Sequence, residues 1–253
     1  MKRIIVLAAV LGLTLFYGRL GFAQTNDRIN EELNKLKQDM QALKSDIQAI
    51  KDMLQPKQAA GPTADKPIAV SIEGGATKGA RDAKVTLIEF TDYQCPFCSR
   101  HFRDTLPQID NDYVKTGKIR YVLREFPLET IHPMAFKAAE AANCSGEQGK
   151  YWEMHDRLFG NQNALGADQL PSYAQAVGLD AGKFKACLDS GKYTSKVRKD
   201  LAEAQKAGVN GTPTFFVGLT DPKNAEIKAV KKIVGAQNYA AFKAAIDSLL
   251  AQQ

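Results

Sequence analysis

The sequence predicts an α/β domain preceded by an N-terminal coiled-coil helix, and three observations lead to this class. Strand-like and helix-like patterns alternate after about residue 68, a strict heptad pattern occupies residues 26–54, and a Pro-rich segment separates the two. The order β-α-β, then a helical block, then β-β-α is typical of one sheet covered by helices. The 253 residues, 44% of them hydrophobic, suffice for one sizeable core plus an appendage.

Residues 1–23 have the pattern of a secretory signal peptide. Lys2 and Arg3 give a charged start, Ile4 to Phe16 is almost wholly apolar, and Gly21-Phe22-Ala23 is a small-x-small cleavage site. The alternative is an uncleaved membrane anchor. It is disfavoured because the apolar run is short for a span and a Gly-Arg pair interrupts it.

The basic net charge says little about partners. Cleavage after residue 23 would remove three basic residues and no acid, and would lower the formal charge from +6 to +3. Because the chain has no dense Lys/Arg cluster, we expect no nucleic-acid partner. Four cysteines in an exported chain fit an oxidising compartment, so we expect a periplasmic protein.

Residues 26–54 form an unbroken heptad pattern that predicts a coiled-coil stalk. Acidic residues occupy the g positions and lysines the following e positions, so parallel chains would attract each other. The alternative, an amphipathic helix docked on its own domain, normally shows a wider apolar stripe. We therefore expect a homo-oligomer, and a trimer rather than a dimer, because Leu and Met at a with Ile at d disfavour a strict dimer. The a and d residues are Ile29, Leu33, Leu36, Met40, Leu43, Ile47, Ile50 and Leu54.

The stalk is followed by a linker and then by the globular domain. Residues 55–67 contain three prolines and several small or polar residues, which predicts a partly extended linker. The domain is expected over residues 68–253. Its expected strands are 68–72, 85–91, 118–126, 214–217 and 228–234, its expected helices are 96–112 and 239–251, and a helical pattern covers 133–208.

Cys95-Pro96-Phe97-Cys98 is the motif that indicates chemistry. It follows an apolar strand and opens a predicted helix, whose unpaired N–H groups and partial positive charge favour thiolate over thiol. We expect Cys95 to be the attacking thiolate and the more exposed thiol, and Cys98 to resolve the mixed disulfide. The alternative, half of a zinc site, needs two further ligands. The other cysteines and the histidines offer no suitable pair, so we expect no metal.

These elements, with the C-P-F-C motif at the first strand–helix junction, resemble the DsbA family of thiol–disulfide oxidoreductases. The specific marks are residues 90–98, Phe126-Pro127-Leu128 and the segment from Gly208 to Phe215. The resemblance covers roughly residue 68 to the C-terminus. It implies a thioredoxin-like fold with a helical insertion at about residues 130–208.

The resemblance also implies roles for three further residues. The segment around Pro213 is similar to the family's cis-proline loop, in which the backbone of Thr212 would pair with an extended client segment. Glu89 matches an acid that moves protons for the buried cysteine, and burial would raise its pKa. The alternative for Glu89 is an exposed strand position. Asp92 is expected to be an exposed loop acid or a cap.

Cys144 and Cys187 both fall within the helical block. The expected arrangement is a structural disulfide, which could contribute roughly 4 kcal/mol in the chain-entropy model. A second redox pair is the alternative, and it is disfavoured because neither residue has a partner at C-x-x-C spacing. Two separate buried thiols form the third possibility.

The functional expectation is a periplasmic thiol–disulfide oxidoreductase without a cofactor, acting on unfolded or misoxidised secreted proteins. The stalk would bring several C-P-F-C sites around one client, as in dimeric DsbC-like isomerases and in trimeric members linked to copper tolerance. Family members that are strong oxidants commonly carry histidine where this chain has Phe97, and isomerases of the family often carry threonine where it has Thr212. The resemblance therefore favours isomerase or reductase behaviour with a DsbD-like membrane partner. The alternatives are a DsbA-like oxidase with a DsbB-like partner, and a chaperone-like protein that holds Cu(I) between two thiolates.

Overall fold

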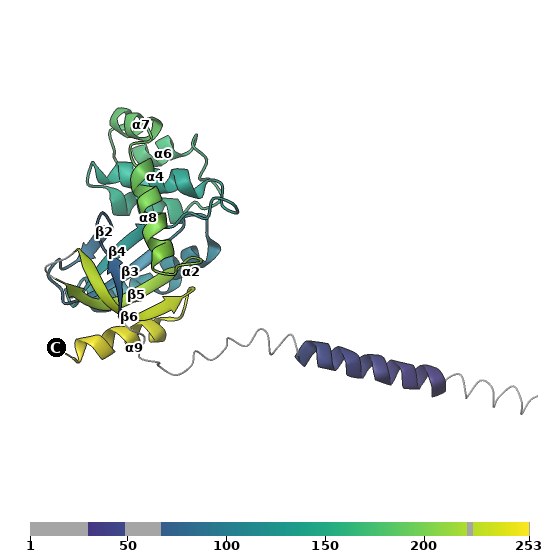
Figure 1. Ribbon diagram of the computed structural model, residues 1–253. Coiled ribbons are helices and arrows are strands. Elements are labelled where there is room, and N and C mark those ends of the chain that lie inside the picture. The colour runs from purple at the N-terminus through teal and green to yellow at the C-terminus, as the bar shows by residue number, and fades with distance from the viewer. Residues whose placement is uncertain (1–29, 49–66, 222–224, 253) are drawn as a thin grey trace, which may run out of the picture. The chain divides into compact units, whose positions relative to one another are not determined.

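The computed structural model describes residues 30–48, 67–221 and 225–252, and the chain divides into two compact units, Met1–Ala64 and Asp65–Gln253. In the first unit the described residues 30–48 form one α-helix, α1 (Figure 1). Every described side chain of this helix is exposed, including the apolar Leu33, Leu36, Met40, Leu43 and Ile47. The expected signal peptide, both ends of the expected stalk and residues 55–66 of the expected linker lie outside the described residues.

The second unit contains a sheet of six strands within the described residues. The spatial order is β1-β6-β5-β3-β4-β2, in which β3 and β4 are parallel and all other neighbours are antiparallel. A parallel pair needs a crossover connection, and helices supply it between β3 and β4. The strands are β1 Ile68–Ser71, β2 Ala76–Gly79, β3 Val85–Thr91, β4 Ile119–Glu125, β5 Thr214–Asp221 and β6 Glu226–Val234.

The helices fall into a crossover, an inserted block and a C-terminal helix (Figure 1). The inserted block lies between β4 and β5, so the expected α/β fold class with a helical insertion is confirmed. The crossover consists of α2 Pro96–Asp104, α3 Leu106–Ile109 and the π-helix η1 Asp110–Val114. The block consists of α4 Ala135–Gly146, α5 Tyr151–Phe159, α6 Leu170–Ala176, α7 Ala181–Asp189 and α8 Thr194–Lys206, and the last helix is α9 Tyr239–Leu250.

Both faces of the sheet are covered, which explains why β3 is buried at every position. Leu87 and Phe215 belong to the core on the face that α2 and α9 cover, together with the inserted helices. Ile88 and Phe216 belong to a second cluster, to which α8 contributes Ala204. Successive residues of a strand point to opposite faces, so an apolar run is what a central strand requires.

The structure differs from the sequence expectation in the crossover and at the sheet edge. The single helix expected over residues 96–112 is wrong, because α2 ends at Asp104. Pro107 cannot donate a helical hydrogen bond, and its ring would clash one turn earlier. The edge strand β2 was not expected, since its four residues, Ala-Thr-Lys-Gly, carry no apolar pattern. β5 runs on to Asp221, with a bulge after Val217.

Candidate active site

Cys95 lies where three segments from different parts of the chain meet. It is the N-cap residue of α2, and Pro96 is the first helical residue, where no N–H is needed. The Sγ atom of Cys95 lies 3.4 Å from the carbonyl oxygen of Thr212, to which the thiol donates. The peptide bond between Thr212 and Pro213 is cis. Gln162 of the helical insertion donates to the Cys95 carbonyl oxygen at 3.1 Å.

The two thiols of the motif are free and differ in their environment. Cys95 is 3% exposed and Cys98 is fully buried. A hydrogen bond from Cys98 lowers the pKa of Cys95 to about 6, and the Thr212 side chain and the backbone N–H groups of Cys98 and Phe97 act in the same direction against burial. Burial raises the pKa of Cys98 well above its ordinary value. At neutral pH the charge therefore resides on Cys95 and the proton on Cys98.

Asp92 organises the loop before Cys95. One carboxylate oxygen accepts the N–H groups of Gln94 (2.7 Å) and Cys95 (3.1 Å), as in an Asx-turn. The other accepts the N–H of Leu128 at 2.8 Å and lies 2.8 Å from Nδ1 of His132. The side chain is buried, so the expectation of an exposed acid is wrong. Burial follows because Asp92 joins the active-site loop to the segment after β4.

Glu89 is a residue of β3, and its side chain points to the face of the sheet that α2 covers. The Tyr121 hydroxyl donates to its Oε2, and His101 Nε2 lies 3.8 Å from the same oxygen. Burial raises the pKa of Glu89 to about 7, although hydrogen bonds from Tyr121 and Thr91 oppose that rise. Burial also lowers the pKa of His101 to about 3, so this imidazole is neutral near pH 7. Glu89 can thus hold or release a proton at neutral pH.

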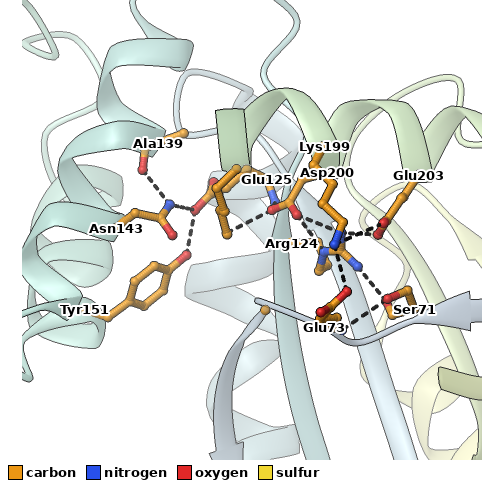
Figure 2. A network of polar contacts seen from close by, with 12 residues as sticks. Ser71, Glu73, Arg124, Glu125, Ala139, Asn143, Tyr151, Lys199, Asp200 and Glu203 are labelled. Carbon is orange, nitrogen blue, oxygen red and sulfur yellow. Dashed lines mark hydrogen bonds and ion pairs between the residues drawn. The ribbon is translucent and has the colours of Figure 1, made fainter. Parts of the chain in front are cut away.

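Glu125 is a further buried carboxyl group, which the sequence reasoning did not single out. It accepts hydrogen bonds from the Tyr151 hydroxyl (2.7 Å) and from Asn143 (3.1 Å), and Figure 2 shows it between these two residues and Asp200. Burial raises its pKa to about 7. The Tyr151 hydroxyl lies 3.2 Å from that of Tyr93, two residues before Cys95, so hydrogen bonds connect Glu125 to the active-site loop.

Arg124 anchors the strand that carries Glu125. Its buried guanidinium donates to Asp200 of α8 at 2.7 and 2.9 Å and to the Ser71 carbonyl oxygen at 2.6 Å (Figure 2). Glu203 accepts a further hydrogen bond at 2.5 Å. These contacts tie β4 and β1 to the helix that leads into the loop of Pro213. No local sequence signal could have found them, since the partners of Arg124 lie 53, 76 and 79 residues away along the chain.

Cys144 and Cys187 form a disulfide between α4 and α7. The bond lies within the helical insertion and joins residues 43 positions apart. Both residues are buried, with Cys187 7% exposed. The active-site thiols and this disulfide therefore occupy different parts of the domain.

Comparison with known proteins places this geometry in a family. A family model described as thioredoxin matches residues 71–248, most of the chain. α-DsbA1 of Wolbachia pipientis is 26% identical, with a TM-score of 0.63 over 72% of this chain and 94% of that one. A thioredoxin-like oxidoreductase from Silicibacter pomeroyi is 28% identical, with a TM-score of 0.57 over 69% and 91%. The chain belongs to the thioredoxin family.

The structural matches also define a narrower class within the thioredoxin family. The matches to α-DsbA1 and to the Silicibacter pomeroyi oxidoreductase, each covering more than nine tenths of the matched chain, make this chain a DsbA-type thiol–disulfide oxidoreductase. The resemblance expected from the sequence is thereby confirmed.

Curated relatives of similar sequence are much longer proteins. The Na(+)/H(+) antiporter NhaA 3 of Salinispora tropica is 37% identical over 153 residues, which are 60% of this chain and 23% of the antiporter. NhaA of Herminiimonas arsenicoxydans is 36% identical over 162 residues, or 61% of this chain and 25% of that protein. The chain therefore spans about a quarter of their length. Over its described residues, no helix is long and apolar enough to cross a bilayer.

Proposed function

We propose that this chain is a periplasmic thiol–disulfide oxidoreductase that shuffles or reduces disulfides in secreted proteins. The observation that carries the proposal is the division of roles between the two thiols. Cys95 has a pKa of about 6 and lies beside the Thr212 carbonyl oxygen, while burial keeps the proton on Cys98. The similarity to the antiporters covers a quarter of each of them, so antiport is not part of the proposal.

The proposed reaction begins with attack by the Cys95 thiolate on a client disulfide. A bond forms between Cys95 Sγ and one client sulfur, and the other client sulfur leaves as a thiolate. In reduction, Cys98 then attacks Cys95, which closes the Cys95–Cys98 disulfide and releases the second client thiolate. In isomerisation, a client thiolate attacks the mixed disulfide instead and restores the reduced enzyme. A DsbD-like membrane partner would return two electrons after each reduction.

The client would bind to the cis-proline loop. Thr212 and Cys95 are in contact, so an extended client segment pairing with the Thr212 backbone would hold its sulfur beside the thiolate. Phe97 and Val234 are more than half exposed, and the N–H of Gly235, next to Val234, donates to the Pro213 carbonyl oxygen at 2.8 Å. These apolar side chains would contact unfolded clients of varied sequence.

The stalk is proposed to assemble several copies around one client. Leu36 and Leu43, at d positions of α1, are 63% and 58% exposed in the single chain, and a parallel coiled coil would bury them. We propose a trimer rather than a dimer. Replacing Leu36 and Leu43 by Glu should give monomers in light scattering. The same charges at the f positions, Gln38 and Ser45, should leave the oligomer intact, and oligomers in both variants would contradict the proposal.

The decisive experiment is refolding of scrambled, fully oxidised ribonuclease. The mature protein should restore ribonuclease activity, and the monomeric Leu36→Glu, Leu43→Glu variant should restore it less. Equal recovery of ribonuclease activity with both proteins would show that isomerisation does not need oligomerisation through the stalk. No recovery by either, with rapid oxidation of reduced ribonuclease, would overturn the isomerase proposal.

One observation favours a DsbA-like oxidase as the second candidate. The pKa of Cys95, about 6, stabilises the thiolate of the reduced enzyme, and a stable reduced form makes its disulfide a stronger oxidant. Equilibration with glutathione buffers separates the candidates. A potential near that of DsbA, about −120 mV, would favour the oxidase, and one near or below about −180 mV the isomerase or reductase.

A further inference from the structure

Gln162 of the helical insertion contacts the active-site loop through its side-chain amide. It lies in the turn that follows α5, and its side chain is partly buried. Its Nε2 atom donates to the carbonyl oxygen of Tyr93 at 2.7 Å and to that of Cys95 at 3.1 Å. A side-chain amide has two N–H donors, so these two carbonyl groups use both of them. The reversed amide would place its own oxygen against two carbonyl oxygens, so the loop also fixes the orientation of the amide.

The backbone of Cys95 is thereby held from both ends. Its N–H donates to a carboxylate oxygen of Asp92 at 3.1 Å. Its carbonyl oxygen accepts the N–H of Ser99 at 3.1 Å, which opens the hydrogen-bond ladder of α2, in addition to the amide of Gln162. A carbonyl oxygen has two lone pairs and can accept both hydrogen bonds. Gln162 therefore adds a restraint on this peptide group from a position 67 residues away.

Other residues of the insertion supply the packing against the same loop. The ring of Tyr93 is fully buried, and its centroid lies 5.0 Å from that of Phe159. The hydroxyl of Tyr93 lies 3.2 Å from that of Tyr151. These side chains keep the insertion packed on the loop whether or not residue 162 has an amide. The amide of Gln162 therefore acts on the direction of the backbone rather than on the packing.

The direction of the Cys95 backbone decides where its sulfur lies. Sγ is 3.4 Å from the carbonyl oxygen of Thr212. The backbone N–H groups of Phe97 and Cys98 lower the pKa of Cys95 through hydrogen bonds to its sulfur. A hydrogen bond weakens steeply as its angle departs from linearity, so a rotation of the Cys95 peptide group would cost the thiolate part of this stabilisation.

We propose that Gln162 is a positioning residue for disulfide exchange, which holds the carbonyl groups of Tyr93 and Cys95 and so aims the Cys95 sulfur at the N–H groups of α2. The residue acts through the backbone of the loop and not on the client. This gives the helical insertion a part in the first chemical step, the attack by Cys95. The inference rests on the proposed exchange activity.

The test compares the reduced, full-length wild type with Gln162→Met, whose side chain has a similar length and no N–H donor. Absorbance near 240 nm against pH follows the thiolate of Cys95, whose pKa is about 6 in the wild type. Loss of the two hydrogen bonds should raise the midpoint by about one pH unit. Alkylation of Cys95 by iodoacetamide should be about fivefold slower at pH 6, and within about twofold of wild type at pH 9, where both proteins carry the thiolate.

Gln148→Met is the matched control, because Gln148 is another glutamine of the insertion whose side chain bonds to backbone groups. Its amide donates to the Asp180 carbonyl oxygen at 3.3 Å and accepts the Asp180 N–H at 2.9 Å. Its loss should change neither the midpoint nor the alkylation rates. An equal shift in Gln148→Met would overturn the proposal, since any lost hydrogen bond within the insertion would then have the same effect.

Coincident titration curves for wild type and Gln162→Met would also overturn the positioning role. Gln162→Asn, whose amide is one methylene shorter, carries the same test if Gln162→Met does not fold. If the wild-type protein neither reduces insulin nor refolds scrambled ribonuclease, the proposed exchange function fails instead, whatever midpoint the Gln162 variants show.

Discussion

Cys95 and Cys98 lie three residues apart at the start of α2 and carry free thiols, whereas Cys144 and Cys187 are joined across α4 and α7. Hydrogen bonds stabilise a thiolate at Cys95. Cys187, by contrast, is closed in a disulfide that joins two helices of the insertion, and the carboxylate beside its Sγ is paired with Lys192. The comparison teaches that a pair at a helix start with a stabilised thiolate is suited to exchange, whereas a pair that joins two helices is suited to holding them together.

The largest expected effect separates the two pairs by activity. Cys95→Ser should abolish disulfide exchange, by a factor of about a thousand or more, because serine cannot form the attacking thiolate. Replacing Cys144 and Cys187 together by Ser should leave the exchange rate of the folded protein within about threefold of wild type. Insulin reduction measures both. A comparable loss in the double variant would break the division of roles.

The second expected effect concerns stability, for which the Cys144–Cys187 pair should matter more than the Cys95–Cys98 pair. Loss of the Cys144–Cys187 disulfide should lower the free energy of unfolding by roughly 4 kcal/mol, because its open loop of 43 residues gains entropy in the unfolded chain. Urea unfolding under conditions that keep Cys95 and Cys98 reduced measures this change. Cys98→Ala in the same assay is the control, and an equal loss there would contradict a special structural role for the closed pair.

The third expected effect tests the buried acid next to the first pair. Burial raises the pKa of Glu89 to about 7 from 4.5, so between these values the folded protein keeps a proton that the unfolded chain has lost. The free energy of unfolding therefore falls as pH rises from about 4.5 to 7. Glu89→Gln should remove up to about 3 kcal/mol of this fall.

Urea unfolding at pH 5 and pH 8 measures the difference. Glu125→Gln is the matched variant, because burial raises the pKa of Glu125 to about 7 as well. It should likewise reduce the fall in the free energy of unfolding over this pH range. Glu89→Gln alone should also slow the attack of Cys98 on a mixed disulfide at Cys95, seen as release of the second coloured thiolate when the reduced protein reacts with dithiobis(nitrobenzoate), because the variant lacks the carboxylate that can take a proton. If the free energy of unfolding changed equally with pH in wild type and in Glu89→Gln, the raised pKa of Glu89 would be contradicted.

The smallest expected effect concerns the pKa of Cys95 and its dependence on the neighbouring side chain. Phe97 is 53% exposed and cannot hydrogen-bond a thiolate. Phe97→His would add a donor and a positive charge near Cys95 and should lower the pKa of Cys95 further, by about one unit. Absorbance of the thiolate near 240 nm against pH measures it, with Phe97→Leu as a control that should not shift the curve. An unchanged pKa would show that Thr212 and Cys98 already saturate the stabilisation.

The regular elements of the domain could be predicted because their patterns are local. The strand over Val85–Thr91 is an apolar run, and the last helix over Tyr239–Leu250 has a helical period, so burial of each fixes its conformation. The edge strand Ala76–Gly79 has no such pattern and is held by pairing with β4. The helix expected over the crossover is interrupted at Thr105, two residues before Pro107, whose effect on a helix the sequence prediction overlooked.

The site divides in the same way. The positions of Cys95, Cys98 and Glu89 along the chain already indicate an attacking thiol, a resolving thiol and an acid. The partners of Asp92 and Arg124 could not be read from the sequence, because Leu128 and Asp200 are 36 and 76 residues away. Long-range contacts of this kind depend on how the helices and strands pack against one another. Packing is determined by many weak van der Waals contacts between distant segments, and a short stretch of sequence does not reveal them.

The sequence by itself determined the fold class and the C-P-F-C pair, because apolar periodicity and the spacing of two thiols are properties of neighbouring residues. Only the tertiary structure decided which groups set the chemistry of that pair. It brought Thr212 to Cys95 across 117 positions and buried both Glu89 and Cys98 in the interior of the domain. The physical reason is that a pKa depends on burial and on nearby charges and hydrogen bonds, all of which arise only when distant segments pack together.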